Sequence, residues 1–376
     1  MQLALTDAQK EARLSFRDFV RDKIVPFAGQ WDREGRIPFQ IVDELRRRGY
    51  IGAPLPAKSG GGDMDPITYG LLTEEIAKGC SSVRSLLTVH DMVTLAISRW
   101  GNQELKAKVS AGAKGELLCA LALSEPEAGS DAAGVRTEAR LEGDEYILTG
   151  RKKWITFGQI AHLFLVLARY DGQLAAFTVP ADSPGFVRRP LEGVVGTRAS
   201  LLAELEFNQC RIPRHCLTGR VGFGLSHVVS TALDHGRYSV AWGSVGIAQA
   251  CLDACLTYTA SRRQFGVELR RHQLVQRKLT NMIADTRAAR LLCYRAGYLR
   301  QIGDPDATAE TLIAKYFSSR VAVRAANDAV QLHGANGLTE EFQVERYLRD
   351  AKVMEIIEGS TQIQQMTIAT SPVGEL

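Results

Sequence analysis

The chain has 376 residues, of which 45% are hydrophobic and 23% charged, with a net charge of +4 at pH 7. This length and composition exclude a disordered chain and allow a large core divided over two or three subdomains. Basic residues mix with acidic ones, so we expect no nucleic-acid surface, and no apolar run reaches about 18 residues, so we expect no membrane span. The seven cysteines form no CxxC pair, which favours a reducing, cytoplasmic setting.

Residues 1–117 are predicted to be helical. Thr6 and Gln9 match a capping box, and apolar residues then recur at helical spacing until Pro26 ends the run. Residues 118–225 instead contain short apolar runs separated by turn residues, which predicts a small β-barrel or sandwich. These runs lie at 117–123, 146–148, 163–167, 175–179 and 203–207.

Residues 226–376 return to helical spacing, and glycine and proline breakers divide them into separate helices. An up-and-down bundle is the simplest arrangement of such segments. The predicted helices span 227–260, 272–301 and 307–332, with a shorter one after Ser360. The sequence therefore predicts an α+β protein with a helical, a β and a second helical part.

Two segments of the predicted β part have residues suited to a flat heterocycle. Residues 124–131, Ser-Glu-Pro-Glu-Ala-Gly-Ser-Asp, offer hydroxyls and free N–H groups that can hold the polar edge of a ring or a phosphate; an ordinary turn is the alternative. Trp154 can lie against a ring, and Thr156 is expected on the same strand face because strand side chains alternate. The alternative is that Trp154 belongs to the core. No nicotinamide, Walker or metal-binding motif is present.

The C-terminal part contains two further candidates. Arg262 and Phe265 close a long predicted helix, and a guanidinium beside an aromatic ring suits a pyrophosphate or an adenine; a solvated helix end is the alternative. Glu358 is a lone carboxylate after two isoleucines and before a helix start. Burial against Ile356 and Ile357 is expected to raise its pKa toward that of a general base, whereas the alternative is a solvated acid at a helix N-terminus.

The order and spacing of these motifs together resemble the acyl-CoA dehydrogenase family over nearly the whole chain. The matching stretches are 5–26, 124–131, 150–156, 233–237, 262–266 with 272–273, 331–337, 349–352 and 358–360. The resemblance implies a helical N-terminal domain, a central β domain and a C-terminal four-helix bundle. It also implies FAD as the cofactor.

The resemblance implies a role for each matching residue. The residues at the isoalloxazine ring would be Leu121, Leu123, Ser124, Ser130, Trp154 and Thr156, with the Thr156 hydroxyl near the flavin N5. Those at the adenine and pyrophosphate would be Arg262, Phe265, His272, Gln273, Gln331, Gly334 and Ala335, with part of the site supplied by a neighbouring subunit. Ser360 and Gln362 would also contact FAD, and the thioester substrate would face Ser130, Asp234, Arg237 and Gly359.

Glu358 would be the base that removes the α-proton of an acyl thioester while the β-hydrogen leaves as hydride to the flavin N5. Such a proton is too weakly acidic for a carboxylate in water, so hydrogen bonds must hold the carbonyl oxygen and strengthen as enolate charge develops. In the family these come from the backbone N–H of the glutamate and a ribityl hydroxyl of the flavin. The resemblance further implies a homo-oligomer, either a dimer or a tetramer, and an electron-transfer flavoprotein or another acceptor that reoxidises the FAD.

A narrower resemblance concerns the substrate. The stretches 80–85, 236–243 and 352–360 look like the branch that oxidises short polar acyl groups on acyl carrier proteins, for extender units such as hydroxymalonyl, methoxymalonyl or aminomalonyl in polyketide assembly. Ile357 replaces the tyrosine usual in fatty-acyl members, and Ser360 replaces a threonine. Both residues depart from the pattern of the fatty-acyl enzymes and argue against a fatty-acid substrate. Ala335 replaces a glycine and should barely disturb FAD.

Arg84, Ser85 and Thr88 fall in the helix that, in the family, closes the far end of the acyl tunnel. Arg84 and Thr88 lie one helical turn apart and share a face. An arginine there would repel a methyl end and favour a carboxylate or hydroxyl; the alternative is that it points outward and pairs with a surface acid. Two other functions remain open: an acyl-CoA dehydrogenase of fatty-acid or amino-acid catabolism, and a non-catalytic flavin-binding scaffold of the same fold.

Overall fold

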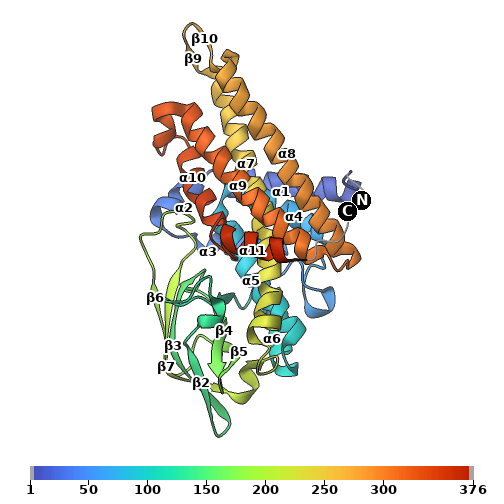
Figure 1. Cartoon of the computed structure of the whole chain (residues 1–376), viewed down its shortest axis with the longest axis vertical. Helices are drawn as coiled ribbons and strands as arrows, with labels where there is room; N and C mark the ends of the chain where they lie inside the picture. Colours follow the sequence, from blue (N-terminus) through green and yellow to red (C-terminus); the bar gives the residue numbers. More distant parts are fainter. Residues whose placement is uncertain (1–3, 372–376) are drawn as a thin grey trace.

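The computed structural model describes residues 4–371, which form helical, β and helical parts in chain order (Figure 1). The N-terminal helices are α1 (Asp7–Lys23), α2 (Ala28–Glu34), α3 (Phe39–Arg47), α4 (Pro66–Gly79), α5 (Ser81–Trp100) and α6 (Gln103–Ala113). The strands of the middle part are β1 (Cys119–Ala122), β2 (Glu138–Glu142), β3 (Glu145–Ile155), β4 (Leu163–Tyr170), β5 (Gln173–Pro180), β6 (Phe186–Pro190), β7 (Ala203–Pro213) and β8 (Leu217–Thr218). The C-terminal elements are α7 (Ser230–Ser261), the hairpin strands β9 (Arg263–Gln264) and β10 (Val267–Glu268), α8 (Gln273–Ile302), α9 (Ala307–His333), α10 (Val344–Met354) and α11 (Thr361–Thr370). The predicted α+β order is confirmed.

The first helix begins at the predicted capping box. The Gln9 N–H donates to the Thr6 hydroxyl at 3.2 Å, and the Thr6 N–H donates to the Gln9 side chain at 3.1 Å. Such a cap typically stabilises a helix by about 1 kcal/mol. Phe16, Phe19 and Val20 then bury the apolar face of α1 in the core that the helices share. The predicted helical spacing therefore corresponds to a packed face.

The middle strands form an eight-stranded sheet in the order β6-β7-β3-β2-β4-β5-β8, with β1 pairing in parallel with β4. A separate apolar core, including Phe164, Phe177 and Phe207, fills this part. The sequence does not predict β2 or β6, because their charged residues obscure the apolar alternation. In the sheet the charged residues of β2 lie on its exposed face, and β6 is a largely exposed edge strand.

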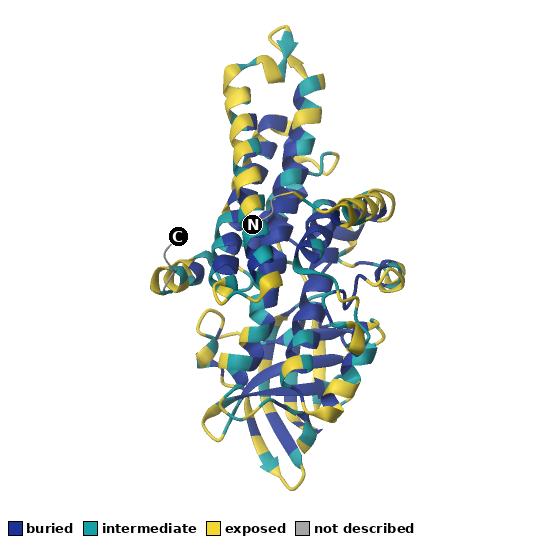
Figure 2. Cartoon of the chain, turned by 90° about the vertical axis from the view of Figure 1, so that its right-hand side faces the viewer, coloured by how far each residue is buried: buried dark blue, intermediate teal, exposed yellow. Residues whose placement is uncertain are grey.

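Helix α7 is the centre of the C-terminal part and packs against α4, α5, α8 and α9. In Figure 2 the long helices are buried on the sides that face one another and exposed on their outer sides. A π-helical turn, Gly224–Val229, precedes it and contains the predicted start at His227. The helical stretch Gly224–Ser261 is long and apolar enough to cross a bilayer, but 72% of its most apolar window is buried inside the protein. Its composition is therefore explained by its place in the core.

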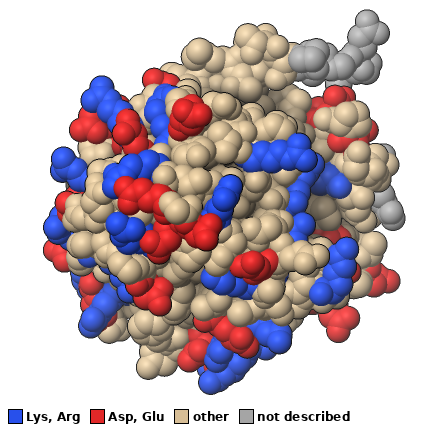
Figure 3. Space-filling model, turned by 90° about the horizontal axis from the view of Figure 1, so that it is seen from below, with Lys and Arg blue, Asp and Glu red and all other residues tan. Residues whose placement is uncertain are grey.

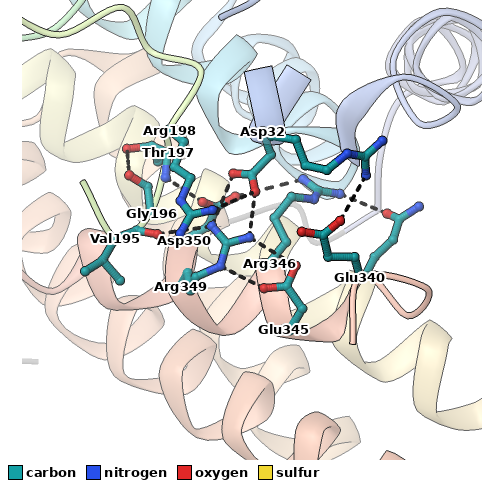
Figure 4. Close-up of polar contacts among 12 residues, drawn as sticks. Asp32, Val195, Gly196, Thr197, Arg198, Glu340, Glu345, Arg346, Arg349 and Asp350 are labelled. Carbon is teal, nitrogen blue, oxygen red and sulfur yellow. Dashed lines mark hydrogen bonds and ion pairs between the residues drawn. The ribbon is translucent and has the colours of Figure 1, made fainter. Parts of the chain in front are cut away.

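One polar cluster joins the three parts of the chain (Figure 4). Arg349 on α10 donates to both carboxylate oxygens of Asp32 on α2, at 3.2 and 2.6 Å, and to the carbonyl of Val195 at 3.1 Å. Asp350 accepts a hydrogen bond from the N–H of Thr197 at 2.6 Å. The Arg349 cluster (Asp32, Val195, Thr197, Arg349 and Asp350) thus ties α2 and the loop between β6 and β7 to α10.

The surface charges are mixed in sign, and the cysteines are unpaired. On the face seen from below, Lys and Arg side chains are interspersed with Asp and Glu, so this face has no basic stripe (Figure 3). All seven cysteines are buried free thiols. Free thiols accord with the reducing setting expected from the sequence, which stays a prediction.

Candidate active site

Glu358 lies in the turn between α10 and α11, in a backbone conformation unusual for its residue type. Its φ is 57° and that of Gly359 is 94°, so two successive residues are left-handed. A non-glycine residue in this region is destabilised by roughly 1–2 kcal/mol. The turn directs the Glu358 side chain toward α7, where a Cβ on Gly236 would lie 2.8 Å from its Oε2 atom. Gly236 therefore leaves the space that the carboxylate occupies.

One oxygen of the Glu358 carboxyl group is shielded from water. This Oε2 atom is buried and has no hydrogen-bond partner among residues 4–371. Burial raises the pKa of Glu358 to about 7, while attraction to Arg237, Lys315 and Arg84 opposes part of the rise. A carboxyl group with this pKa is partly deprotonated at neutral pH, as a general base requires. The pKa rises as expected, but Ile356 is not the cause, because it is 59% exposed.

Arg84 on α5 is fully buried, so the surface alternative is wrong for it. Its Nη1 donates to the Thr88 hydroxyl at 3.0 Å and its Nη2 to the Met354 sulfur at 3.3 Å, whereas its Nε has no partner in the described chain. Burial lowers the pKa of Arg84 to about 10, so the guanidinium stays charged at neutral pH. None of the ion pairs formed within residues 4–371 includes Arg84. A buried cation in this state is suited to an oxygen-bearing ligand.

Buried polar side chains continue from Thr88 toward α4. The Thr88 hydroxyl lies 2.6 Å from that of Ser239, and the Tyr69 hydroxyl lies 3.0 Å from both Asp91 Oδ2 and His235 Nε2. Burial raises the pKa of Asp91 to about 8 and lowers that of His235 to about 3, so both groups are mainly neutral at pH 7. Sequence reasoning named Thr88 but assigned no role to Ser239, Tyr69, Asp91 or His235, since single polar residues in apolar helices give no motif.

Ser124 and Trp154 lie side by side near the end of β3. The N–H of Lys153 donates to the Ser124 carbonyl at 2.9 Å, which brings the loop after β1 next to Trp154. Trp154 has a φ of 66° and is 54% exposed, at an irregularity in the pairing of β3 with β7. Regular alternation is therefore wrong for this segment, and Thr156 lies in the turn after β3 rather than on the strand. The exposure of Trp154 also contradicts the core alternative.

A buried ion pair fixes the loop between β1 and β2. Lys152 on β3 lies 2.8 Å from the Glu125 carboxylate and donates to the Leu123 carbonyl at 2.9 Å. Glu125 also accepts hydrogen bonds from the N–H groups of Arg136 and Thr137, at 2.6 and 2.9 Å. Burial alone would raise the pKa of Glu125, but the hydrogen bonds, that of Lys152 first, lower it below its ordinary value. This pair was not among the sequence candidates.

Two further candidates are Arg237 on α7 and Leu121 on β1. Arg237 on α7 donates from Nε to the Glu358 carbonyl at 3.1 Å. Leu121 on β1 packs against the apolar cluster that contains Met92, whose sulfur would lie 2.7 Å from a Cβ on Gly236. Leu121 thus packs at the apolar contact between the sheet and helix α5.

The remaining candidates near this region have other neighbours. Asp234 forms an ion pair with Arg300 at 2.8 Å, which engages its carboxylate within the chain. The Ser85 hydroxyl faces that of Ser200 at 2.9 Å, away from the row that contains Thr88. Ser360 accepts a hydrogen bond from the N–H of Ile363 and caps α11. Of these remaining candidates, Ser130 and Gln362 are exposed.

The structure separates the predicted adenine residues from the ring residues. The β9–β10 hairpin, with Arg262 and Phe265, stands at one end of the long helices, and the sheet stands at the other (Figure 1). Residues 331–335 lie at the hairpin end, because Tyr258, one turn before Arg262, stacks on His333 with ring centroids 4.2 Å apart. A single chain thus does not join the two sets, as a site shared between subunits requires.

The side chains at both ends fit the parts of an FAD. At the sheet, the exposed indole of Trp154 provides an apolar plane, and the Ser124 backbone is bonded to the neighbouring Lys153. At the hairpin, Phe265 is 93% exposed and follows Arg262 by three residues, and an aromatic ring with a guanidinium suits an adenine and a pyrophosphate. These residues would hold the two ends of the cofactor.

Two residues that contact the Glu358 turn were not predicted from the sequence. Lys315 on α9 donates to the Gly359 carbonyl at 2.7 Å, and Gln364 on α11 donates to the Glu358 carbonyl at 3.1 Å. Both side chains belong to fully buried residues. A lysine and a glutamine within helices give no sequence signal for such contacts, because only the tertiary packing decides where they point.

Three family models match the chain in sequence order. They describe the N-terminal, middle and C-terminal domains of acyl-CoA dehydrogenase and match residues 6–114, 120–210 and 223–371. The mitochondrial short-chain specific acyl-CoA dehydrogenase of Rattus norvegicus is 36% identical over 372 residues, which cover 97% of this chain and 90% of the rat protein.

Solved structures resemble the whole chain as well. Butyryl-CoA dehydrogenase from Megasphaera elsdenii is 35% identical and superposes with a TM-score of 0.94 over 98% of this chain and 99% of its own. FkbI, a protein for biosynthesis of the methoxymalonyl extender unit of the polyketide FK520, is 32% identical and superposes with a TM-score of 0.86 over 95% of this chain and 98% of its own.

Proposed function

Because this chain belongs to the acyl-CoA dehydrogenase family and is an FAD-dependent oxidoreductase, we propose that Glu358 is its catalytic base. The observation that supports this most directly is the buried, unpartnered Oε2 atom of Glu358 beside Gly236. Its backbone N–H makes no hydrogen bond within residues 4–371 and is free to donate to a thioester carbonyl oxygen. The same residue would thus supply both the base and one oxyanion donor.

The reaction removes a proton and a hydride from adjacent carbons of the acyl group and leaves a double bond between them. Glu358 takes the α-proton, and its pKa of about 7 lets it start deprotonated in a large share of molecules. FAD, where the residues at the sheet and at the hairpin hold it, would supply the acceptor for the hydride that leaves the β-carbon. Arg237 holds the carbonyl of Glu358 and so fixes the direction from which the base approaches.

The substrate is a short acyl group with an oxygen or nitrogen substituent. The observation behind this choice is Arg84, a buried guanidinium whose Nε has no partner and which has no paired carboxylate in the described chain. A methyl end would leave this cation unsatisfied, whereas a hydroxyl or carboxylate would accept its hydrogen bond. Ile357 beside the base accords with a substrate other than a fatty acid.

An acyl carrier protein delivers this acyl group, as in the synthesis of polyketide extender units. The 32% identity with FkbI over 95% of the chain supports this choice. The second candidate is a catabolic dehydrogenase of simple acyl-CoA thioesters, which the likeness to the butyryl-CoA and short-chain enzymes favours. A cytoplasmic setting and an electron-transfer flavoprotein as the electron acceptor belong to both proposals.

Substrate choice should depend on Arg84. We expect wild-type flavin to be reduced faster by a three-carbon hydroxylated acyl group on a carrier protein than by butyryl-CoA or octanoyl-CoA. Arg84→Leu should slow the hydroxylated substrate by about 10–100-fold, because one charge-assisted hydrogen bond contributes about 1.5–3 kcal/mol. The measurement is single-turnover bleaching of the flavin.

Arg99→Leu is the matched control, because Arg99 is an exposed arginine on the same helix. Loading the same hydroxylated acyl group on CoA and on the carrier separates recognition of the acyl end from recognition of the carrier. Faster reduction of wild-type flavin by the simple acyl-CoAs would contradict the carrier proposal and favour the catabolic one.

FAD affinity should depend on Arg262 at the hairpin. We expect Arg262→Ala to weaken FAD by about 1.5–3 kcal/mol per lost charge-assisted hydrogen bond, while the protein stays folded. Equilibrium dialysis against FAD measures the affinity. Mixing Arg262→Ala with a Trp154→Ala chain should restore tight sites if the two sets come from different subunits, and unchanged weak binding in the mixed oligomer would contradict the shared site.

A further inference from the structure

The turn that contains Glu358 is held by donors from three different helices. The Glu358 carbonyl accepts hydrogen bonds from Arg237 Nε on α7 and Gln364 Nε2 on α11, both at 3.1 Å. The Gly359 carbonyl accepts from Lys315 Nζ on α9 at 2.7 Å. Because both residues are left-handed, the turn needs such outside support to keep one conformation.

Lys315 differs from the other two donors in its charge environment. It is fully buried, and it forms no ion pair within residues 4–371, although the charges of Glu358 and Glu355 attract it. Burial lowers the pKa of Lys315 to about 8, so it is mainly charged at neutral pH. A buried ammonium group whose hydrogen-bond acceptor is one backbone carbonyl is unusual, because burial disfavours the charge.

We propose that Lys315 is a positioning residue for the base: its hydrogen bond to the Gly359 carbonyl fixes the turn, and its charge favours the deprotonated form of Glu358. This inference rests on the proposed role of Glu358. It extends that role to α9 by assigning a function to a residue that contacts the backbone of the turn and lies far from the base in sequence.

The charges around Glu358 define the expected direction of the effect. Its carboxylate faces Arg84 from α5, Arg237 from α7 and Lys315 from α9. Lys315 in turn faces Glu358, Glu355 and Arg237. Removing the Lys315 charge takes away one of three attractions that lower the pKa of Glu358. The pKa of Glu358 should then rise, and the pH at which the base becomes active should rise with it.

The test compares Lys315→Met, which removes the donor and the charge, with Lys315→Gln, which removes the charge and keeps a donor. We expect Lys315→Met to slow single-turnover flavin reduction at pH 7 by roughly tenfold or more and to move the rising limb of the pH profile up by about one unit. Lys315→Gln should show the same pH shift with a smaller loss of the limiting rate at high pH. FAD content and thermal midpoint report whether each variant is folded.

A second readout does not depend on turnover. Difference infrared titration follows the Glu358 carboxyl group directly, identified as the signal that Glu358→Gln lacks, and it should show the same upward shift in both Lys315 variants. Lys278→Met is the matched control. Lys278 on α8 pairs with Asp328 on α9, the helix that contains Lys315, away from the turn.

The outcomes separate this inference from the proposed function. If Glu358→Gln keeps the wild-type rate, the base lies elsewhere and the proposed function fails. If Glu358→Gln is inactive while Lys315→Met keeps the wild-type rate and pH midpoint, only the role of Lys315 is overturned. If Lys315→Met fails to retain FAD, Lys315→Gln decides through its pH midpoint, and an unchanged midpoint there also overturns the inference.

Discussion

Glu358→Gln is expected to retain FAD and to slow substrate-dependent flavin reduction by at least about 10²–10⁴-fold. Glutamine keeps the size of the side chain in the space beside Gly236, so binding of the cofactor and of the thioester should survive. It cannot accept the α-proton, because its amide has no useful basicity. Stopped-flow bleaching of the flavin measures the rate, and the visible spectrum measures the bound FAD.

Glu355→Gln is the control for this prediction. Glu355 lies three residues earlier, and its carboxylate pairs with Lys352 at 2.7 Å rather than facing α7. We expect that variant to react within a few-fold of wild type, since an ion pair with the exposed Lys352 contributes little. Near-normal bleaching in Glu358→Gln would assign the base to another residue, while full loss in both variants would indicate damage to the turn as a whole.

Lys152→Met should destabilise the protein by about 3–5 kcal/mol, because it leaves the buried Glu125 carboxylate without its cation. The loop between β1 and β2, with Ser124, should loosen and the protein should lose FAD more readily. The shift of the urea or thermal midpoint measures the first effect, and release of FAD on dilution measures the second. The double variant with Glu125→Gln should recover much of the loss, since it removes the unpaired charge.

The neighbouring Lys153 provides a matched control for Lys152. Its pair with Glu204 at 2.7 Å is partly exposed, so Lys153→Met should change stability by no more than about 1 kcal/mol. The Glu125 contribution also has a direction in pH. Because the pKa of Glu125 is lowered by folding, its stabilisation is present above the ordinary carboxyl pKa and is lost as the pH falls through the folded value. A small effect of Lys152→Met, equal to the control, would show that the pair is dispensable.

The order of helical and β parts could be predicted from the sequence, because periodicity and caps are local properties. Thr6 and Gln9 form the predicted box, and the apolar runs that become β3, β4, β5 and β7 are visible without any partner. Strand β6 escaped prediction because it is an exposed edge strand, whose sequence need not be apolar. The irregularity at Trp154 escaped as well, since a break in strand pairing is decided by the strand opposite.

Some features of the candidate site could likewise be predicted from the sequence, whereas others depend on tertiary packing. Glu358 stands out in the sequence because a carboxylate follows two isoleucines, yet its environment comes from Gly236 and Met92, which lie far away in the chain. Arg84 could be placed on a helix face but not inside or outside the protein until the helices were packed. Lys315 gave no signal at all, because its partner is a backbone carbonyl 44 residues away.

The Arg349 cluster bears on how the protein is made. Arg349 and Asp32 are 317 residues apart, so closing that loop is entropically unfavourable until the intervening parts have packed. Domains synthesised first generally fold first. The loop beside Trp154 can therefore take shape while the last helices are still leaving the ribosome, whereas α10 can dock only afterwards. A nascent chain would therefore form the loop beside Trp154 before α10 and the turn with Glu358, the proposed base, reach their places.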